Sequence, residues 1–237
     1  VFKAGILPRC AELLDRRTLE VVRSKDPSID RRGTAMLIVE LDGDELACDR
    51  AMERVGAACD AAGAITVLVA QDATRRDALW SARRALSTTT RAMAKFKVSE
   101  DVVVPRRHIP TLLEELERMR EGEARASEER GDGPEARIEL LAYGHAGDGN
   151  LHVNFLWNQA EAAPRVEQLL GQLFRKVVEL GGTLTGEHGV GLSKAPYLRL
   201  EQSDATISLQ QRIKAVFDPK GLLNPGKIFA PRGHGLC

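Results

Sequence analysis

The stretch Tyr143–Phe155, YGHAGDGNLHVNF, decides how this chain is built. Asp148-Gly149 is a favoured central pair for a two-residue type I′ β-turn, so the flanking segments are predicted to pair as a hairpin. In that register His145 faces His152. Side chains alternate between the two faces of a strand, so one face is predicted to be polar and the other apolar. The polar face carries His145, His152, Tyr143 and Asn154, and the apolar face carries Leu151, Val153 and Phe155.

Apolar runs and helical patterns alternate on both sides of this hairpin. Strands are expected over 34–41, 65–70, 101–104, 137–143 and 151–157, and helices within 1–24 and over 45–62, 72–93, 109–130 and 164–180. This order favours an α+β fold with a mostly antiparallel sheet over a doubly wound parallel sheet. Two consecutive units, 34–97 and 98–181, are expected, followed by a C-terminal segment, 182–237.

Composition narrows the class of protein. Lys plus Arg number 34 and Asp plus Glu number 34, so the formal net charge is zero and a nucleic-acid binder that relies on bulk positive charge is not expected. Apolar runs such as 64–70 are too short to span a bilayer. The cysteines lack the close spacing of a zinc knuckle or a redox pair, which favours a reduced, cytoplasmic protein. The chain begins with Val, and we expect it to be part of a longer protein.

The two hairpin histidines are candidate metal ligands. Directly opposed side chains on paired strands have Cβ atoms about 5 Å apart. At that separation the rings of His145 and His152 can share one ion, since Zn–N bonds are about 2.0–2.1 Å. The alternative is a pair of ordinary surface or core histidines, and a different turn register would separate the rings.

A second glycine-rich stretch, GGTLTGEHGVG at 181–191, carries an acidic residue beside a histidine. Glu187 can complete a His/His/Glu metal site that keeps a position open for substrate. His188 can then act as a general base, since its ordinary pKa lies near neutral pH. The alternative is a capped helix start with Glu187 and His188 facing solvent.

Cationic side chains supply the remaining candidates. Arg83 lies in a predicted helix, where a guanidinium can bind a carboxylate through two hydrogen bonds. The alternative for Arg83 is an ordinary surface charge. Lys97, just before a predicted strand, is a weaker candidate of the same kind.

Three motifs in this order, GHAGDGNLHVN, GGTLTGEHGVG and FDPKGLLNPGKIF, resemble the C-terminal domain of FAD-linked 2-hydroxy acid dehydrogenases. That family includes the glycolate oxidase FAD subunit, D-lactate dehydrogenase and D-2-hydroxyglutarate dehydrogenase. The resemblance covers essentially the whole chain. It implies a ferredoxin-like, duplicated α+β cap domain with helices on one face of the sheet and a C-terminal helical tail. It also implies a separate N-terminal domain that holds most of the FAD.

The resemblance implies roles residue by residue. The positions that match metal ligands, for Zn²⁺, Mn²⁺ or Fe²⁺, are His145, His152 and Glu187. His188 matches the base that takes the substrate's hydroxyl proton. The positions that match substrate-binding groups are Arg83, Ser87, Asn154 and, less cleanly aligned, Lys97. In the tail that packs towards the flavin, the matching positions are Asn224 and Lys227.

The activity implied is oxidation of a 2-hydroxy acid, of the glycolate or D-lactate type, with hydride transfer to FAD. The expected partners are that substrate, the protein's own FAD-binding domain and an iron–sulfur or electron-transfer subunit, through which the cytoplasmic protein can reach a membrane. The chain alone is expected to be inactive as an oxidoreductase. Two alternatives stay open at this stage: a non-catalytic module that binds a small molecule, and a metal-dependent hydrolase that uses the same His/His/Glu set.

Overall fold

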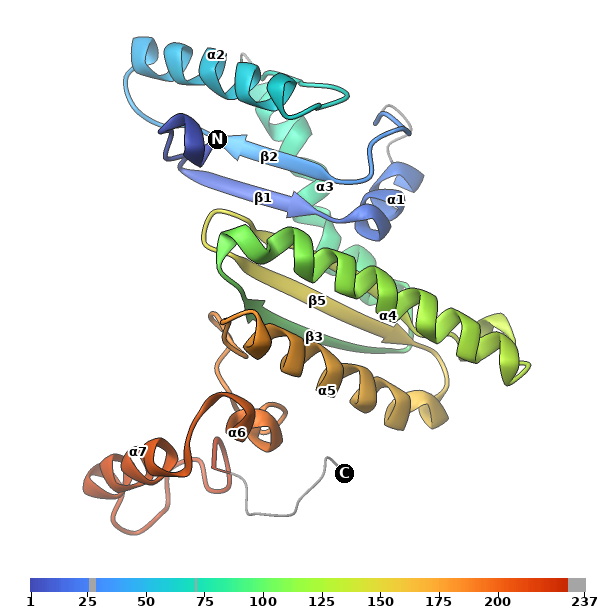
Figure 1. The fold of residues 1–237 in the computed structure, drawn as a ribbon, viewed down its shortest axis with the longest axis vertical. Coiled ribbons are helices and arrows are strands. Elements are labelled where there is room, and N and C mark those ends of the chain that lie inside the picture. The colour runs from blue at the N-terminus through green and yellow to red at the C-terminus, as the bar shows by residue number, and fades with distance from the viewer. Residues whose placement is uncertain (26–28, 71, 230–237) are drawn as a thin grey trace.

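The computed structural model describes residues 1–25, 29–70 and 72–229. A five-stranded antiparallel sheet in the order β2-β1-β4-β5-β3 lies at its centre (Figure 1). The strands are β1 (Cys10–Leu14), β2 (Met36–Glu40), β3 (Phe96–Val103), β4 (Glu139–His145) and β5 (Asn150–Trp157). The helices are α1 (Arg16–Lys25), α2 (Glu45–Ala61), α3 (Ala73–Ala92), α4 (Ile109–Glu129), α5 (Ala163–Glu179), α6 (Leu198–Glu201) and α7 (Asp204–Phe217).

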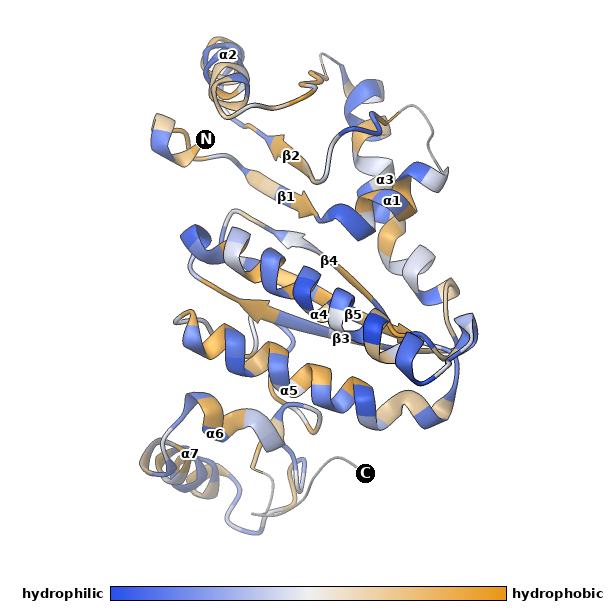
Figure 2. Ribbon diagram, turned by 45° about the vertical axis from the view of Figure 1, so that its right-hand side comes forward, coloured by the Kyte–Doolittle hydropathy of each residue, from blue (hydrophilic) through white to orange (hydrophobic). Residues whose placement is uncertain are grey.

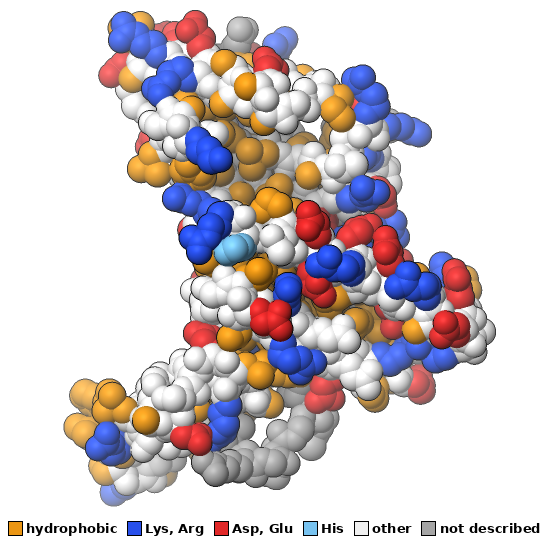
Figure 3. Space-filling view, in the orientation of Figure 1, with side chains coloured by type: hydrophobic (Ala, Val, Ile, Leu, Met, Phe, Trp, Pro, Cys, Tyr) orange, Lys and Arg blue, Asp and Glu red, His pale blue; other side chains and the backbone are white. Residues whose placement is uncertain are grey.

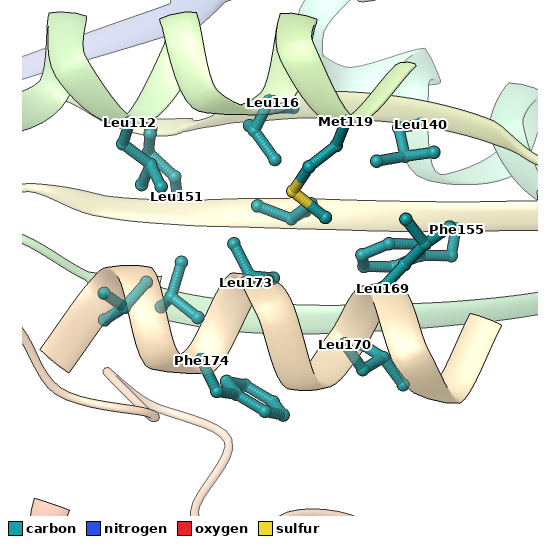
Figure 4. Packing of buried hydrophobic residues seen from close by; sticks show 14 of the residues in the cluster. Leu112, Leu116, Met119, Leu140, Leu151, Phe155, Leu169, Leu170, Leu173 and Phe174 are labelled. Atoms are coloured by element: carbon teal, nitrogen blue, oxygen red, sulfur yellow. The ribbon is translucent and has the colours of Figure 1, made fainter. Parts of the chain in front are cut away.

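The main core lies between one face of the sheet and the helices α4 and α5. Both helices are hydrophobic on part of their surface and hydrophilic on the rest (Figure 2). Leu116 of α4 and Leu173 of α5 are fully buried against Val153 and Phe155 of β5 (Figure 4). Removing one such leucine side chain typically costs about 2–5 kcal/mol of stability. The apolar face predicted for the second hairpin strand therefore anchors the sheet to its helices.

Helices also cover part of the opposite face, which corrects the expectation of helices on one face. Leu13 packs against the main core, and its neighbour Leu14 points the other way. Leu14 and Tyr143 of β4 there form a second cluster with Val22 of α1 and Leu86 of α3. The helices α1 and α3, from the first half of the chain, thus pack on the sheet face opposite α4 and α5.

Most predicted helices and strands are confirmed. The helices expected over 45–62, 72–93, 109–130 and 164–180 correspond to α2, α3, α4 and α5. Two of them begin at a side-chain cap, because Asp44 accepts a hydrogen bond from the backbone N–H of Ala47 and Asp72 accepts one from Arg75. These caps explain why the helix starts could be predicted within a residue.

Two predictions near the N-terminus are wrong. The helix expected within 1–24 is divided into the strand β1 and the helix α1, because the apolar part of the pattern pairs with β2 and β4. The strand expected over 65–70 is irregular, and Leu68 in it is 69% exposed. An apolar run indicates a need for burial, but it forms a strand only where a partner edge is available.

The ferredoxin-like duplication stays a prediction. The second unit runs in the order β3, α4, β4, β5 and α5, and an isolated bridge between Val103 and Thr183 follows it. The first unit contributes only β2 to the sheet between residues 34 and 70.

The C-terminal segment continues beyond α5 with α6 and α7. Tyr197, just before α6, packs on Phe174 of α5 with ring centroids 4.7 Å apart. The helix α7 lies at the end of the molecule, where hydrophobic side chains gather on the surface (Figure 3). The exposed apolar residues of α7 are Leu209, Ile213, Val216 and Phe217. Within the described ranges, every helix is too short or too polar to cross a membrane.

Candidate metal and substrate site

The hairpin β4–β5 brings the two predicted histidines together, but in a different register. His145 pairs with Asn150 across the ladder, and His152 pairs with Tyr143. The expected His145–His152 pairing is therefore wrong by two positions, because the backbone N–H of Gly149 donates to the carbonyl of His145 and closes a longer turn. A shift of two positions keeps every side chain on its predicted face. The two rings still meet, with centroids 5.4 Å apart.

The loop after α5 carries Glu187 to this pair of rings. One carboxylate oxygen of Glu187 lies 3.3 Å from Nε2 of His152 and 3.9 Å from Nε2 of His145. The loop passes so close to the hairpin that a Cβ on Gly186 would lie 2.7 Å from the side chain of Asn150. A larger residue at position 186 would have to displace the buried Asn150 side chain or the loop that carries Glu187.

The geometry and chemistry of these three side chains fit a divalent metal ion. One ligand atom from each of His145, His152 and Glu187 lies within 4.8 Å of the others. Ligands around a tetrahedral ion with bonds of about 2.1 Å lie roughly 3.4 Å apart, so small side-chain rotations close the site. Burial, followed by the nearby charge of His145, lowers the pKa of His152, which favours the neutral imidazole that a metal needs. Two nitrogens and one oxygen suit Zn²⁺, Mn²⁺ or Fe²⁺.

Asp101 of β3 fixes the loop that carries Glu187. Its side chain is completely buried, and one oxygen accepts hydrogen bonds from the backbone N–H groups of Gly186, Glu187 and His188 at 2.9, 2.5 and 2.8 Å. Its other oxygen pairs with the buried ammonium of Lys194. Burial alone would raise the pKa of Asp101, but Lys194 and the backbone donors together hold that pKa well below its usual range. The loop is therefore clamped by a carboxylate that stays ionised.

His188 lies beside the three candidate ligands. Its ring stacks on that of His152 with centroids 5.4 Å apart, and its Nδ1 lies 3.5 Å from Asp101. About half of its side chain is exposed, and its Nε2 lies 3.9 Å from the Glu187 carboxylate. The ring of His188 is therefore accessible from solvent beside the three candidate ligands.

Arg83 of α3 approaches the same region from the first half of the chain. Its Nε donates to Glu12 at 2.7 Å, and its guanidinium carbon lies 4.8 Å above the ring of Tyr143. The Tyr143 ring is in turn 5.9 Å from that of His152. The side chain is only 15% exposed, so the expectation of an ordinary surface charge does not apply to it.

Known proteins resemble this chain along almost its whole length. A family model described as FAD linked oxidases, C-terminal domain, matches residues 1–228. The chain belongs to this family. This FAD-linked oxidase C-terminal domain is 34% identical over 233 residues to the glycolate oxidase subunit GlcD of Bacillus subtilis (strain 168), covering 97% of the chain and 47% of that relative.

A second curated relative of this FAD-linked oxidase C-terminal domain is the D-lactate dehydrogenase of Anaerostipes hadrus, 32% identical over 198 residues, covering 82% of the chain and 39% of the relative. The chain thus spans less than half the length of these relatives. Among solved structures, alkyldihydroxyacetonephosphate synthase matches with a TM-score of 0.58 at 14% identity, over 94% of this chain and 40% of that one. At that identity the match shows the fold alone.

The other predicted substrate residues of the FAD-linked oxidase C-terminal domain differ in their surroundings. Asn154 is fully buried beneath the site, and its side-chain oxygen has no hydrogen-bond partner within the described residues. Nζ of Lys97 donates to Thr90 at 2.7 Å, and burial, followed by the charge of Arg91, lowers the pKa of Lys97. Ser87 is exposed on α3, one helical turn after the predicted arginine.

The predicted flavin-facing positions of the FAD-linked oxidase C-terminal domain lie in its exposed tail. Lys227 donates to the Asn224 side chain at 3.0 Å. The backbone N–H of Ile228 donates to the carbonyl of Gly191 at 2.8 Å, which ties the tail to the glycine-rich loop. Asn224 and Lys227 thus stand on the loop side of the domain, near the segment that carries Glu187.

Among the buried charged residues of the FAD-linked oxidase C-terminal domain, sequence reasoning missed three that support the candidate site: Glu12, Asp101 and Lys194. Glu12 and Lys194 are 4% and 2% exposed. A usable signal was present for two of them, because Glu12 interrupts the apolar run of β1 and Asp101 begins the strand predicted over 101–104. A charge inside a buried strand is rarely tolerated without partners.

Proposed function

We propose that this domain supplies the metal- and substrate-binding half of a flavin-dependent dehydrogenase that oxidises a 2-hydroxy acid to the 2-oxo acid. The observation that carries the proposal is the meeting of His145, His152 and Glu187 beside His188 and Arg83 in a chain of the FAD-linked oxidase family. The names of the relatives point to glycolate or D-lactate as the substrate type.

Each side chain then has a defined task. His145, His152 and Glu187 would hold the divalent ion. When bound, the ion supplies Lewis-acid polarisation of the substrate hydroxyl, and FAD supplies the hydride acceptor. Arg83 binds the substrate carboxylate through its terminal nitrogens.

His188 completes the chemistry as the general base. Its half-exposed ring takes the hydroxyl proton, and Asp101 at 3.5 Å from Nδ1 keeps the ring oriented. Asn154 and Lys97 place polar groups near the substrate, with Ser87 one helical turn from Arg83. The tail residues Asn224 and Lys227 face the flavin-binding half of the protein.

The partners follow from this assignment. The FAD-binding part of the protein covers the site, and an iron–sulfur or electron-transfer subunit accepts the electrons. The word "subunit" in the name of the Bacillus subtilis relative supports an assembly of this kind.

A binding experiment on the chain tests the proposal. Calorimetric titration with Zn²⁺ is expected to show one site, and D-lactate or glycolate is then expected to bind only after the metal. In the flavin-loaded protein, His188→Asn is expected to leave D-lactate binding intact and to abolish flavin reduction. Substrate binding that is independent of metal, or flavin reduction at the normal rate in His188→Asn, would contradict it.

A further inference from the structure

Glu12 is a buried carboxylate to which the proposed function gives no task. It lies on β1 and is directly opposite His145 in the ladder between β1 and β4. Opposed residues of neighbouring strands share one face of the sheet, so the carboxylate lies on the face that carries the candidate ligands. Glu12 is 4% exposed. A carboxylate this deeply buried needs partners for both oxygens.

Both partners belong to the proposed site. One oxygen of Glu12, Oε1, accepts a hydrogen bond from Nδ1 of His145. The other, Oε2, accepts a hydrogen bond from Nε of Arg83 at 2.7 Å. The two partners are 133 and 71 residues away along the chain. One side chain therefore connects a proposed metal ligand with the proposed carboxylate-binding residue.

The contact with His145 fixes which ring nitrogen is free. Because the carboxylate accepts the Nδ1 proton, the lone pair of the neutral ring lies on Nε2. That nitrogen is the one 3.9 Å from Glu187. Oε1 of Glu12 lies at the Nδ1 edge of the ring, away from Nε2, so Glu12 is not itself a fourth ligand. Hydrogen bonds of this kind orient metal-binding histidines and raise their basicity.

The contact with Arg83 fixes which guanidinium nitrogens are free. Nε is occupied by Glu12, and the guanidinium carbon lies 4.8 Å from the centroid of the Tyr143 ring. In the described part of the chain, neither terminal nitrogen of Arg83 has a hydrogen-bond partner. These two nitrogens form the pair that binds a carboxylate with two parallel hydrogen bonds.

We propose that Glu12 is a positioning residue for both the metal-binding and the substrate-binding part of the site. It determines which ring nitrogen of His145 is free to bind the metal, and it orients the two terminal nitrogens of Arg83. The inference rests on the proposed function, because it takes His145 as a ligand and Arg83 as the anion-binding group. If Glu12 served only the stability of the fold, its ion pair with Arg83 would be sufficient, and the contact with Nδ1 of His145 would not be needed.

Glu12→Gln tests the inference, with Glu139→Gln as a matched control. Glu139 lies on β4 and accepts from Nε of Arg17 at 2.8 Å, so the control removes a more exposed Glu–Arg pair outside the site. Zn²⁺ titration is expected to show about 10–100-fold weaker binding for Glu12→Gln and unchanged binding for Glu139→Gln. At saturating Zn²⁺, D-lactate is expected to bind Glu12→Gln about ten-fold more weakly. Equal affinities in all three proteins would overturn the positioning role.

A measurement without metal separates this inference from the proposed function. Long-range ¹H–¹⁵N correlation spectra report the tautomer of each neutral histidine. In the wild type, His145 is expected to carry its proton on Nδ1, and in Glu12→Gln the Nε2–H form is expected to appear. A wild-type His145 protonated on Nε2 would overturn the inference even if the variant does not fold. A chain that binds no Zn²⁺ but shows the expected tautomers would refute the proposed function and leave the Glu12 contact established.

Discussion

Asp101 accepts a hydrogen bond from the backbone N–H of His188 at 2.8 Å, across 87 residues of sequence. The same carboxylate also accepts from Glu187, so one buried side chain sets the position of a candidate metal ligand and of the candidate base. The site is thus assembled by contacts between strands and a loop that are distant in the sequence. Several measurable consequences depend on these contacts.

Asp101→Asn is expected to destabilise the fold strongly. The change removes one of the two carboxylates that pair with the buried Lys194 ammonium, the other being Glu100 at 3.4 Å, and it weakens the hydrogen bonds that hold the loop. Loss of one member of a buried ion pair typically costs about 3–5 kcal/mol. Urea denaturation at pH 7 measures the difference. Glu115→Gln, which breaks a surface pair with Arg118, is the control and is expected to cost less than about 1 kcal/mol.

The same pair predicts how stability depends on pH. The pKa of Asp101 is held well below its usual range in the folded state, by Lys194 and backbone donors that outweigh burial. A depressed carboxyl pKa gives stability that is fully present above the unfolded value, about 3.9, and is lost as the pH falls below it. The difference in unfolding free energy between wild type and Asp101→Asn should therefore be constant from pH 7 to pH 5. The difference in unfolding free energy should become smaller towards pH 2. A difference that grows on acidification would contradict a low pKa of Asp101 in the folded state.

Gly186→Ala is expected to displace the loop that carries Glu187. The added Cβ would lie 2.7 Å from the side chain of Asn150, which is itself buried. Overpacking of this kind typically costs about 1–3 kcal/mol, and Zn²⁺ affinity should fall with it. Gly56→Ala serves as the control, since a Cβ there meets no atom within 4 Å on α2. This control is expected to stabilise the helix by up to about 1 kcal/mol, and equal behaviour of the two variants would be evidence against the close approach.

Prediction from sequence succeeded where local patterns carry the information. The caps at Asp44 and Asp72 and the alternation through Leu151, Val153 and Phe155 depend on neighbouring residues alone. The faces of His145 and His152 could also be predicted, because a register change of two positions leaves them unchanged.

Prediction failed where the outcome depends on distant partners. The turn between β4 and β5 is fixed partly by the residue that follows β3, because the backbone N–H of Val104 donates to the carbonyl of Gly149 at 3.1 Å. The partners of Glu12 and Asp101 lie 71 to 133 residues away, or in a separate loop, so no local pattern identifies them. The strand predicted over 65–70 is wrong for the same reason, because the apolar composition of a segment does not identify the surface against which it packs.

The metal content of the purified chain shows whether His145, His152 and Glu187 hold a divalent ion. Elemental analysis of wild type, His145→Ala and His108→Ala grown and purified in parallel gives the comparison. His108 precedes α4, and its ring contacts Arg107, so its loss controls for histidine number alone. We expect about one divalent ion per chain in wild type and His108→Ala, and less than about a tenth of that in His145→Ala. Equal metal content in all three, or none in the wild type, would contradict this expectation.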